Sequence, residues 1–92
     1  MIVRISTEGQ YDLGEDSEAA LNELDNQVVA ACDADDESAF RDSFGRLLDL
    51  VRTKGKPVPD DELVGSDVII PPPDVSLEEA RADFTGEGLI PG

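Results

Sequence analysis

The sequence predicts a small α+β domain in which a β-hairpin and a third, strand-like segment pack against an antiparallel helical hairpin. Apolar and polar residues alternate near the N-terminus, a helical period governs the middle of the chain, and prolines impose an extended path on the last third. The chain of 92 residues is long enough for one core. We therefore expect a single domain over residues 1–92, made of a β-hairpin (1–15), a helical hairpin (16–55) and a proline-rich extended segment with a short helix (56–92).

The first segment has the pattern of a β-hairpin. Residues 1–5 and 10–13 alternate apolar and polar side chains, and Thr7-Glu8-Gly9 between them supplies a turn in which Gly9 can take a positive φ. Val3 and Ile5 fall on one face of the first strand. Ile2 and Arg4 fall on the other face, and because two strands alone are not stable in water, at least one face needs a covering layer.

Two amphipathic helices are expected next. The first begins near Asp16 with acids in its first turn, and the second is capped by Asp35 or Asp36 and stops at Gly55 before Pro57. Apolar residues recur at i, i+3 and i+4 in both helices. The two stripes are Leu21, Leu24, Val28, Ala31 and Cys32, then Phe40, Phe44, Leu47, Leu48 and Val51. A link this short makes the helices antiparallel, and we assign the phenylalanines to the core.

The last third is mostly extended. Residues 67–70 have strand character and run into Pro71-Pro72-Pro73, which cannot continue a ladder of hydrogen bonds. Ser76-Leu77-Glu78-Glu79 is a capping box, which predicts a short helix from Leu77 to about Phe84. Two apolar residues then lie in the tail, Leu89 and Ile90, and we expect the tail either to be tied down or to contact a partner.

The charge of the chain points to a protein partner. There are 22 acids and 7 bases, a net charge of −15, and no base lies between Arg4 and Arg41. Such a field repels phosphate backbones and anionic lipid head groups, so we expect no direct binding to nucleic acid and no insertion into a membrane. A basic protein surface is the natural counterpart. The plainer alternative is that the acids only keep a small protein soluble.

The residue inventory offers no chemistry. There is no histidine, and the single cysteine, Cys32, lies in an apolar stripe without a base to activate it. Residues 33–38 resemble the start of a calcium loop, but Ser38 stands where the sixth position needs glycine and Phe44 where the twelfth needs glutamate. We therefore expect a protein that is not an enzyme and that has no catalytic residues, no cofactor and no metal.

The expected compartment is the cytoplasm. One cysteine cannot form an internal disulfide, and no charged-then-apolar signal precedes the first strand-like residues. No apolar run approaches the roughly 20 residues of a membrane span. Any contact with a membrane would then pass through a partner.

Motifs along the whole chain resemble one known family, the PspA-associated proteins (PspAA). They are Met1–Ile5, Glu8–Tyr11, Leu21–Asp25, Asp60–Leu63, Ser66–Asp74, Leu77–Ala80 and Gly88–Gly92, of which the proline segment and the closing Gly-Leu-Ile-Pro-Gly are the specific ones. The resemblance implies a small accessory protein encoded beside phage shock protein A (PspA), the coiled-coil, membrane-remodelling protein of the envelope stress response. It supplies no catalytic residues.

Charge and resemblance together predict a non-catalytic adaptor that binds PspA, or a complex that contains it, and modulates its assembly at membranes. We expect acids of the first helix to steer the encounter and apolar residues of the last third to anchor the complex. The candidate contact residues are Glu15, Glu18, Glu23 and Asp25, with Ile69, Ile70, Leu89 and Ile90. The alternative is a free-standing acidic regulatory module, an inhibitor or a transcription-factor-binding protein unrelated to membranes. Self-association stays open.

Overall fold

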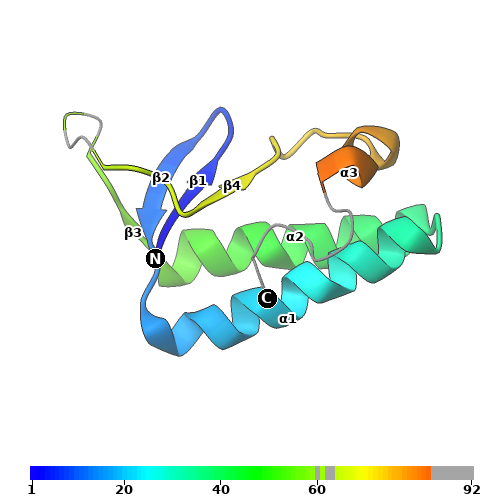
Figure 1. Ribbon diagram of the computed structural model, residues 1–92, viewed down its shortest axis with the longest axis horizontal. Helices are drawn as coiled ribbons and strands as arrows, with labels where there is room; N and C mark the ends of the chain where they lie inside the picture. The colour runs from blue at the N-terminus through cyan, green and yellow to red at the C-terminus, as the bar shows by residue number, and fades with distance from the viewer. Residues whose placement is uncertain (60, 62–63, 84–92) are drawn as a thin grey trace.

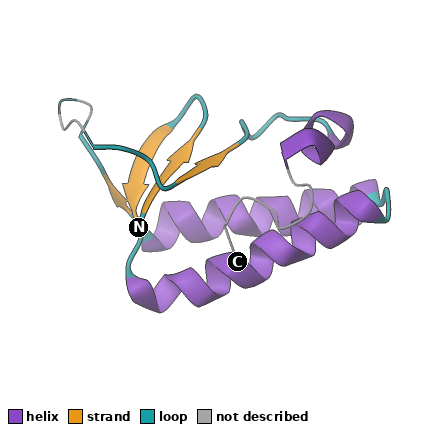
Figure 2. Cartoon of the chain, in the orientation of Figure 1, coloured by secondary structure: helices purple, strands orange, loops and turns teal. Residues whose placement is uncertain are grey.

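The computed structural model describes residues 1–59, 61 and 64–83. Its elements are β1 (Ile2–Ile5), β2 (Gly9–Asp12), α1 (Glu15–Asp33), α2 (Glu37–Lys54), β3 (Lys56–Pro57), β4 (Val68–Ile70) and α3 (Leu77–Asp83). The predicted α+β class is confirmed. A four-stranded sheet lies along one side of the antiparallel α1–α2 pair, and α3 lies beside the same pair nearer to its bend (Figures 1 and 2).

The sheet has the strand order β3-β2-β1-β4. β1 and β2 form the predicted antiparallel hairpin, with Val3 opposite Tyr11, and the turn residue Gly9 takes the expected positive φ, 134°. Thr7 in the same turn also has a positive φ, 75°, which is uncommon for a β-branched residue. The predicted third strand is confirmed as β4, which runs parallel to β1 with Val68 opposite Val3.

One strand was not predicted. β3 is a two-residue strand that pairs antiparallel with β2, placing Pro57 opposite Tyr11 and Lys56 opposite Asp12. A proline has no N–H to donate, so it is tolerated at the edge of a sheet, where one side of the strand needs no partner. Sequence reasoning used Pro57 only as a stop signal for the second helix, whereas in the structure it pairs at the edge of the sheet.

The bend between α1 and α2 is compact because two motifs share its residues. The Asp35 N–H donates to the Cys32 carbonyl at 3.1 Å and the Asp36 N–H to the Ala31 carbonyl at 3.0 Å, the pair of bonds that ends a helix in a Schellman motif. Asp35 takes the left-handed conformation this motif requires, with φ 55°. Asp36, one of the two predicted caps, then accepts a hydrogen bond at Oδ1 from the Ala39 N–H at 3.1 Å and begins α2.

The core lies between the inner face of the sheet and the two helices. Val3 and Ile5 are fully buried while Arg4 between them is exposed, as the alternation predicts. The predicted helical stripes are buried except for Leu24, which is partly buried. Phe40 and Phe44 stack with ring centroids 5.3 Å apart. Their assignment to the core is confirmed.

α3 starts as predicted. Ser76 Oγ accepts a hydrogen bond from the Glu79 N–H at 3.1 Å, and Glu79 Oε1 accepts one from the Ser76 N–H at 3.3 Å, so the capping box is formed in both directions. Ala80 is fully buried and fixes the helix against the core. The predicted end of this helix, Phe84, lies outside the described residues.

An ion pair ties the hairpin turn to the end of α2. Arg52 donates through Nε to Glu8 Oε2 at 3.0 Å and through its terminal nitrogen to Glu8 Oε1. The hydrogen bond from Arg52 lowers the pKa of the Glu8 carboxyl, and the same bond raises the pKa of Arg52. Both side chains remain partly exposed, so solvent screens the pair and its contribution to stability is small.

Replacing Phe44 by alanine should lower the free energy of unfolding by about 3–5 kcal/mol, because the change leaves a cavity against Phe40 in the centre of the core. Chemical denaturation followed by circular dichroism measures the loss. Leu50→Ala on the same helix is the control and should cost less, since Leu50 is only partly buried. A Phe44→Ala variant that melts within a few degrees of the parent would contradict this account of the core.

Replacing Glu8 by glutamine should lower the free energy of unfolding by up to about 1 kcal/mol at neutral pH. Because the folded-state pKa of Glu8 is depressed, its contribution is present above the unfolded-state pKa and disappears as pH falls through the folded-state value. Denaturation at a series of acidic pH values should therefore show the two proteins converging. Asp74→Asn, at an exposed acid in the loop before α3, is the control. A difference in the free energy of unfolding that stays constant down to the lowest pH would show that the loss is not electrostatic.

Candidate protein-interaction surface

The exposed acids of α1 gather mainly in its first half. The helix contains acids but no lysine or arginine, and Glu15, Asp16 and Glu18 occupy its first turn, where the helix dipole favours negative charge. Glu15 and Glu23 are exposed and Glu18 is partly exposed. These three predicted contact residues are therefore accessible, and they define what we call the acidic row. That they bind a partner stays a prediction.

Two of the predicted contact residues belong to the core. Asp25 is 1% exposed, because the helical period places it between Leu21 and Val28 on the stripe that faces the interior. Ile70 is fully buried, since it pairs in register with the buried Ile5 and points to the same side of the sheet. Neither side chain is available to a partner in this structure, so the prediction that they contact one is corrected.

Ile69 and Val64 are the exposed large apolar residues among the described residues of the last third, and Ile69 is the more exposed of the two. It is 58% exposed on the outer face of the sheet, opposite Arg4 of β1, and β4 is the last strand on its side of the described sheet. Its side chain is therefore accessible to a partner, and that it binds one stays a prediction. The two other predicted anchors, Leu89 and Ile90, lie outside the described residues.

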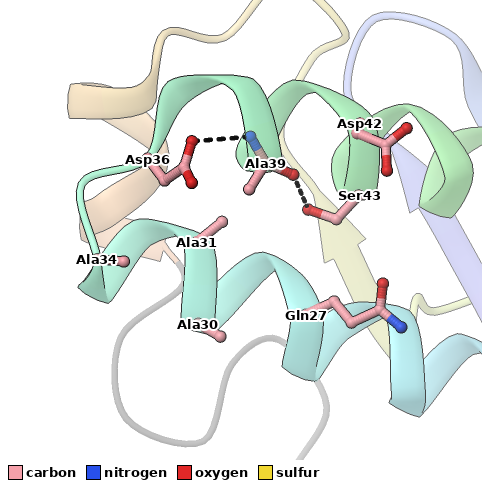
Figure 3. Close-up of a pocket in the computed structure, with 8 residues that line it drawn as sticks. All are labelled: Gln27, Ala30, Ala31, Ala34, Asp36, Ala39, Asp42 and Ser43. Carbon is pink, nitrogen blue, oxygen red and sulfur yellow. Dashed lines mark hydrogen bonds between the residues drawn. The ribbon is translucent and has the colours of Figure 1, made fainter.

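Sequence reasoning missed a shallow groove of about 350 Å³ between α1 and α2, close to their bend. Figure 3 shows it with the sheet and α3 behind the helices, so the groove opens away from the sheet. Small side chains form it. The lining residues are Gln27, Ala30, Ala31 and Ala34 from α1 and its end, then Asp36, Ala39, Asp42 and Ser43 from α2 and its cap. The sequence signal that could have indicated the groove was the alanine at positions 30, 34 and 39, on helix surfaces that otherwise carry polar residues.

The segment that resembles a calcium loop is not a loop. Asp33 ends α1, Asp36 caps α2 and Glu37 begins it, so these carboxylates are spread around a helical bend. Within the described part of the chain, no group of three or more histidine, cysteine, aspartate or glutamate side chains is placed to hold a metal ion. The hydrogen bonds of the Schellman motif and of the Asp36 cap account for the conformation of this bend.

Cys32 is a core residue, as predicted. It is 2% exposed, and burial raises the pKa of its thiol, with the negative charge of Asp33 adding to the effect. A higher pKa reduces the fraction of thiolate, which is the reactive form. The environment therefore makes this thiol a poor nucleophile.

No helix among the described residues is long and apolar enough to cross a membrane.

Comparisons with known proteins give one result. A family model described as PspA-associated protein matches residues 1–92, the whole length of the chain. Neither the curated proteins nor the solved structures contain a significant match.

Cys32 should react slowly with a disulfide reagent such as DTNB in the folded protein and quickly in guanidinium chloride, because burial limits access and the raised pKa limits thiolate. Absorbance of the released thiolate measures both rates. An Ala82→Cys variant that also carries Cys32→Ala supplies an exposed thiol as the control. Equal rates for the folded and unfolded parent would mean that α1 opens readily around residue 32.

Proposed function

We propose, from the premise that this chain belongs to the PspA-associated protein family, that it is a non-catalytic accessory protein that binds PspA or a complex containing it. Its effect would be to modulate PspA assembly at membranes, and it would reach a membrane only through that partner. The family match over residues 1–92 is the observation that carries the proposal, since the family's name associates its members with PspA. The surface of the chain supports it in two ways.

The first support is electrostatic. The acidic row lies on a helix without any base, in a chain with a net charge of −15, so its field favours approach to a basic stretch on a long partner helix. Charges of this kind raise the rate of association more than they strengthen the final complex. The row therefore accounts for encounter and orientation.

The second support is apolar. Ile69 stands 58% exposed on the outer face of the sheet, and burying it against a partner would slow dissociation. An exposed isoleucine contributes nothing until water is removed from it, so it acts after the encounter. The two features thus predict separate effects on the two rate constants.

Neutralising the acidic row should slow association with PspA several-fold and make the association rate less dependent on salt. The variant is Glu15→Gln with Glu18→Gln and Glu23→Gln. Exposed charges act across roughly 10 Å at ordinary ionic strength, so the effect should fade as salt is raised. Surface plasmon resonance or stopped-flow fluorescence with purified PspA, over a series of salt concentrations, measures the rates.

The matched control removes the same number of charges elsewhere, with Asp61→Asn, Asp74→Asn and Glu78→Gln, all exposed. If the control slows association as much as the acidic row does, net charge and not the row is responsible. Ile69→Ser should mainly speed dissociation. A chain that fails to bind PspA, but co-purifies with a DNA-binding protein, would replace the proposed function by the free-standing regulatory module.

A further inference from the structure

We propose that the groove between α1 and α2 is a docking site for an amphipathic helix of a partner protein that carries basic residues beside its apolar stripe, on the flank that faces α2. The inference rests on the proposed function in one respect, that this protein acts by binding another protein. It assigns a different surface from the acidic row and from Ile69.

The shape of the groove suits a helix. Two antiparallel helices leave a furrow that runs along their axes, and a third helix fills such a furrow by packing its ridge of side chains into it. Here the walls are Ala30 and Ala34 on one side and Ala39 on the other, all exposed (Figure 3). Alanine walls let another backbone approach closely, and the volume of about 350 Å³ leaves room for large apolar side chains.

The floor of the groove is effectively apolar. Ala31 and Ser43 are each 4% exposed, and the Ser43 hydroxyl donates to the Ala39 carbonyl of its own helix at 2.7 Å. At the bend, the Asp36 carboxylate already accepts the Ala39 N–H. A side chain entering the groove therefore displaces water without separating a buried polar group from its partner, which is the condition under which apolar burial stabilises a complex.

The rim of the groove is acidic. Asp36 and Asp42 line it, and Asp33 and Glu37 flank the bend in the sequence. Arg46 forms an exposed pair with Asp42 at 3.3 Å, so it offsets one of these charges. Both acids that line the groove lie on the α2 side, so the remaining negative charge complements lysine or arginine on the flank of a bound helix that faces α2, and it repels an acidic helix.

Two other occupants fit less well. A second copy of this chain would bring a net charge of −15 against an acidic rim. The chain's own last residues, 84–92, contain no lysine or arginine. A partner helix with a basic flank toward α2 matches both the apolar floor and the acidic rim, so we commit to this occupant.

The test uses the full chain and a synthetic probe, a leucine–lysine helix of about four turns with leucines in one stripe and lysines on both flanks. Alanine methyl resonances of the 13C-labelled protein report the site of binding, and fluorescence anisotropy of the labelled peptide reports affinity. The methyls of Ala30, Ala34 and Ala39 should shift, while that of Ala82 should not. A peptide with its leucines replaced by alanine should bind about tenfold more weakly or worse, since it keeps charge but loses apolar contact.

Variants distinguish binding in the groove from general electrostatic attraction between the basic peptide and the acidic protein. Ala30→Phe with Ala39→Phe fills the groove and should weaken the leucine–lysine peptide about tenfold or more, whereas Ala82→Phe on α3 should leave its affinity unchanged. If the double variant is unstable, Ala30→Lys replaces it in the test. Lysine is also a strong helix former, and this variant should likewise weaken binding of the peptide. Equal binding to all variants, or methyl shifts centred outside the groove, would overturn the inference.

PspA binding separates this inference from the proposed function. If the peptide occupies the groove but PspA does not bind the chain, the groove stands and the proposed function fails. If PspA binds the groove variants as tightly as the parent, and the peptide does so too, the groove fails while the proposed function stands.

Discussion

The structure depends on the contact between one apolar sheet face and the α1–α2 pair. Val3, Ile5 and Ile70 have nothing else to bury them, and the helical stripes would be exposed to water without the sheet. A domain of this size buries a smaller fraction of its surface than a large domain does, so one such contact supplies much of the stability. Two of the three exposed surfaces lie on the reverse sides of these layers: Ile69 is on the outer face of the sheet, and the groove is on the side of the helices away from the sheet.

Local patterns predicted most of the fold. Alternation of apolar and polar residues predicted the hairpin, and apolar residues at helical spacing predicted both helices. The residue types at the helix starts predicted the Asp36 cap and the Ser76 capping box. β3 was missed because prolines around residue 57 argue against a strand, and only the position of β2 beside them makes an edge pair. That edge is a tertiary feature, so no local pattern contains it.

The candidate surface was harder to predict. Chemical type suggested that Asp25 would be exposed, yet its spacing from Leu21 and Val28 already places it on the buried stripe, so periodicity was the better guide. Ile69 and Ile70 are the same residue type, yet Ile69 is exposed and Ile70 is buried, because successive side chains of a strand point to opposite faces of the sheet. The groove depends on how closely α1 and α2 approach and on which alanines meet there, and a single helix pattern carries no such information.

The parallel pairing of β4 with β1 joins the beginning of the chain to a segment more than sixty residues later. The Asp67 N–H donates to the Ile2 carbonyl at 2.8 Å, the Ser6 N–H donates to the Ile70 carbonyl at 3.0 Å, and the Ile2 N–H donates to the Asp67 carboxylate at 2.8 Å. During synthesis on the ribosome, β1 leaves the exit tunnel long before β4 is made. One edge of β1 therefore stays unpaired until residues 68–70 have been made, and the sheet closes only after both long helices have been synthesised.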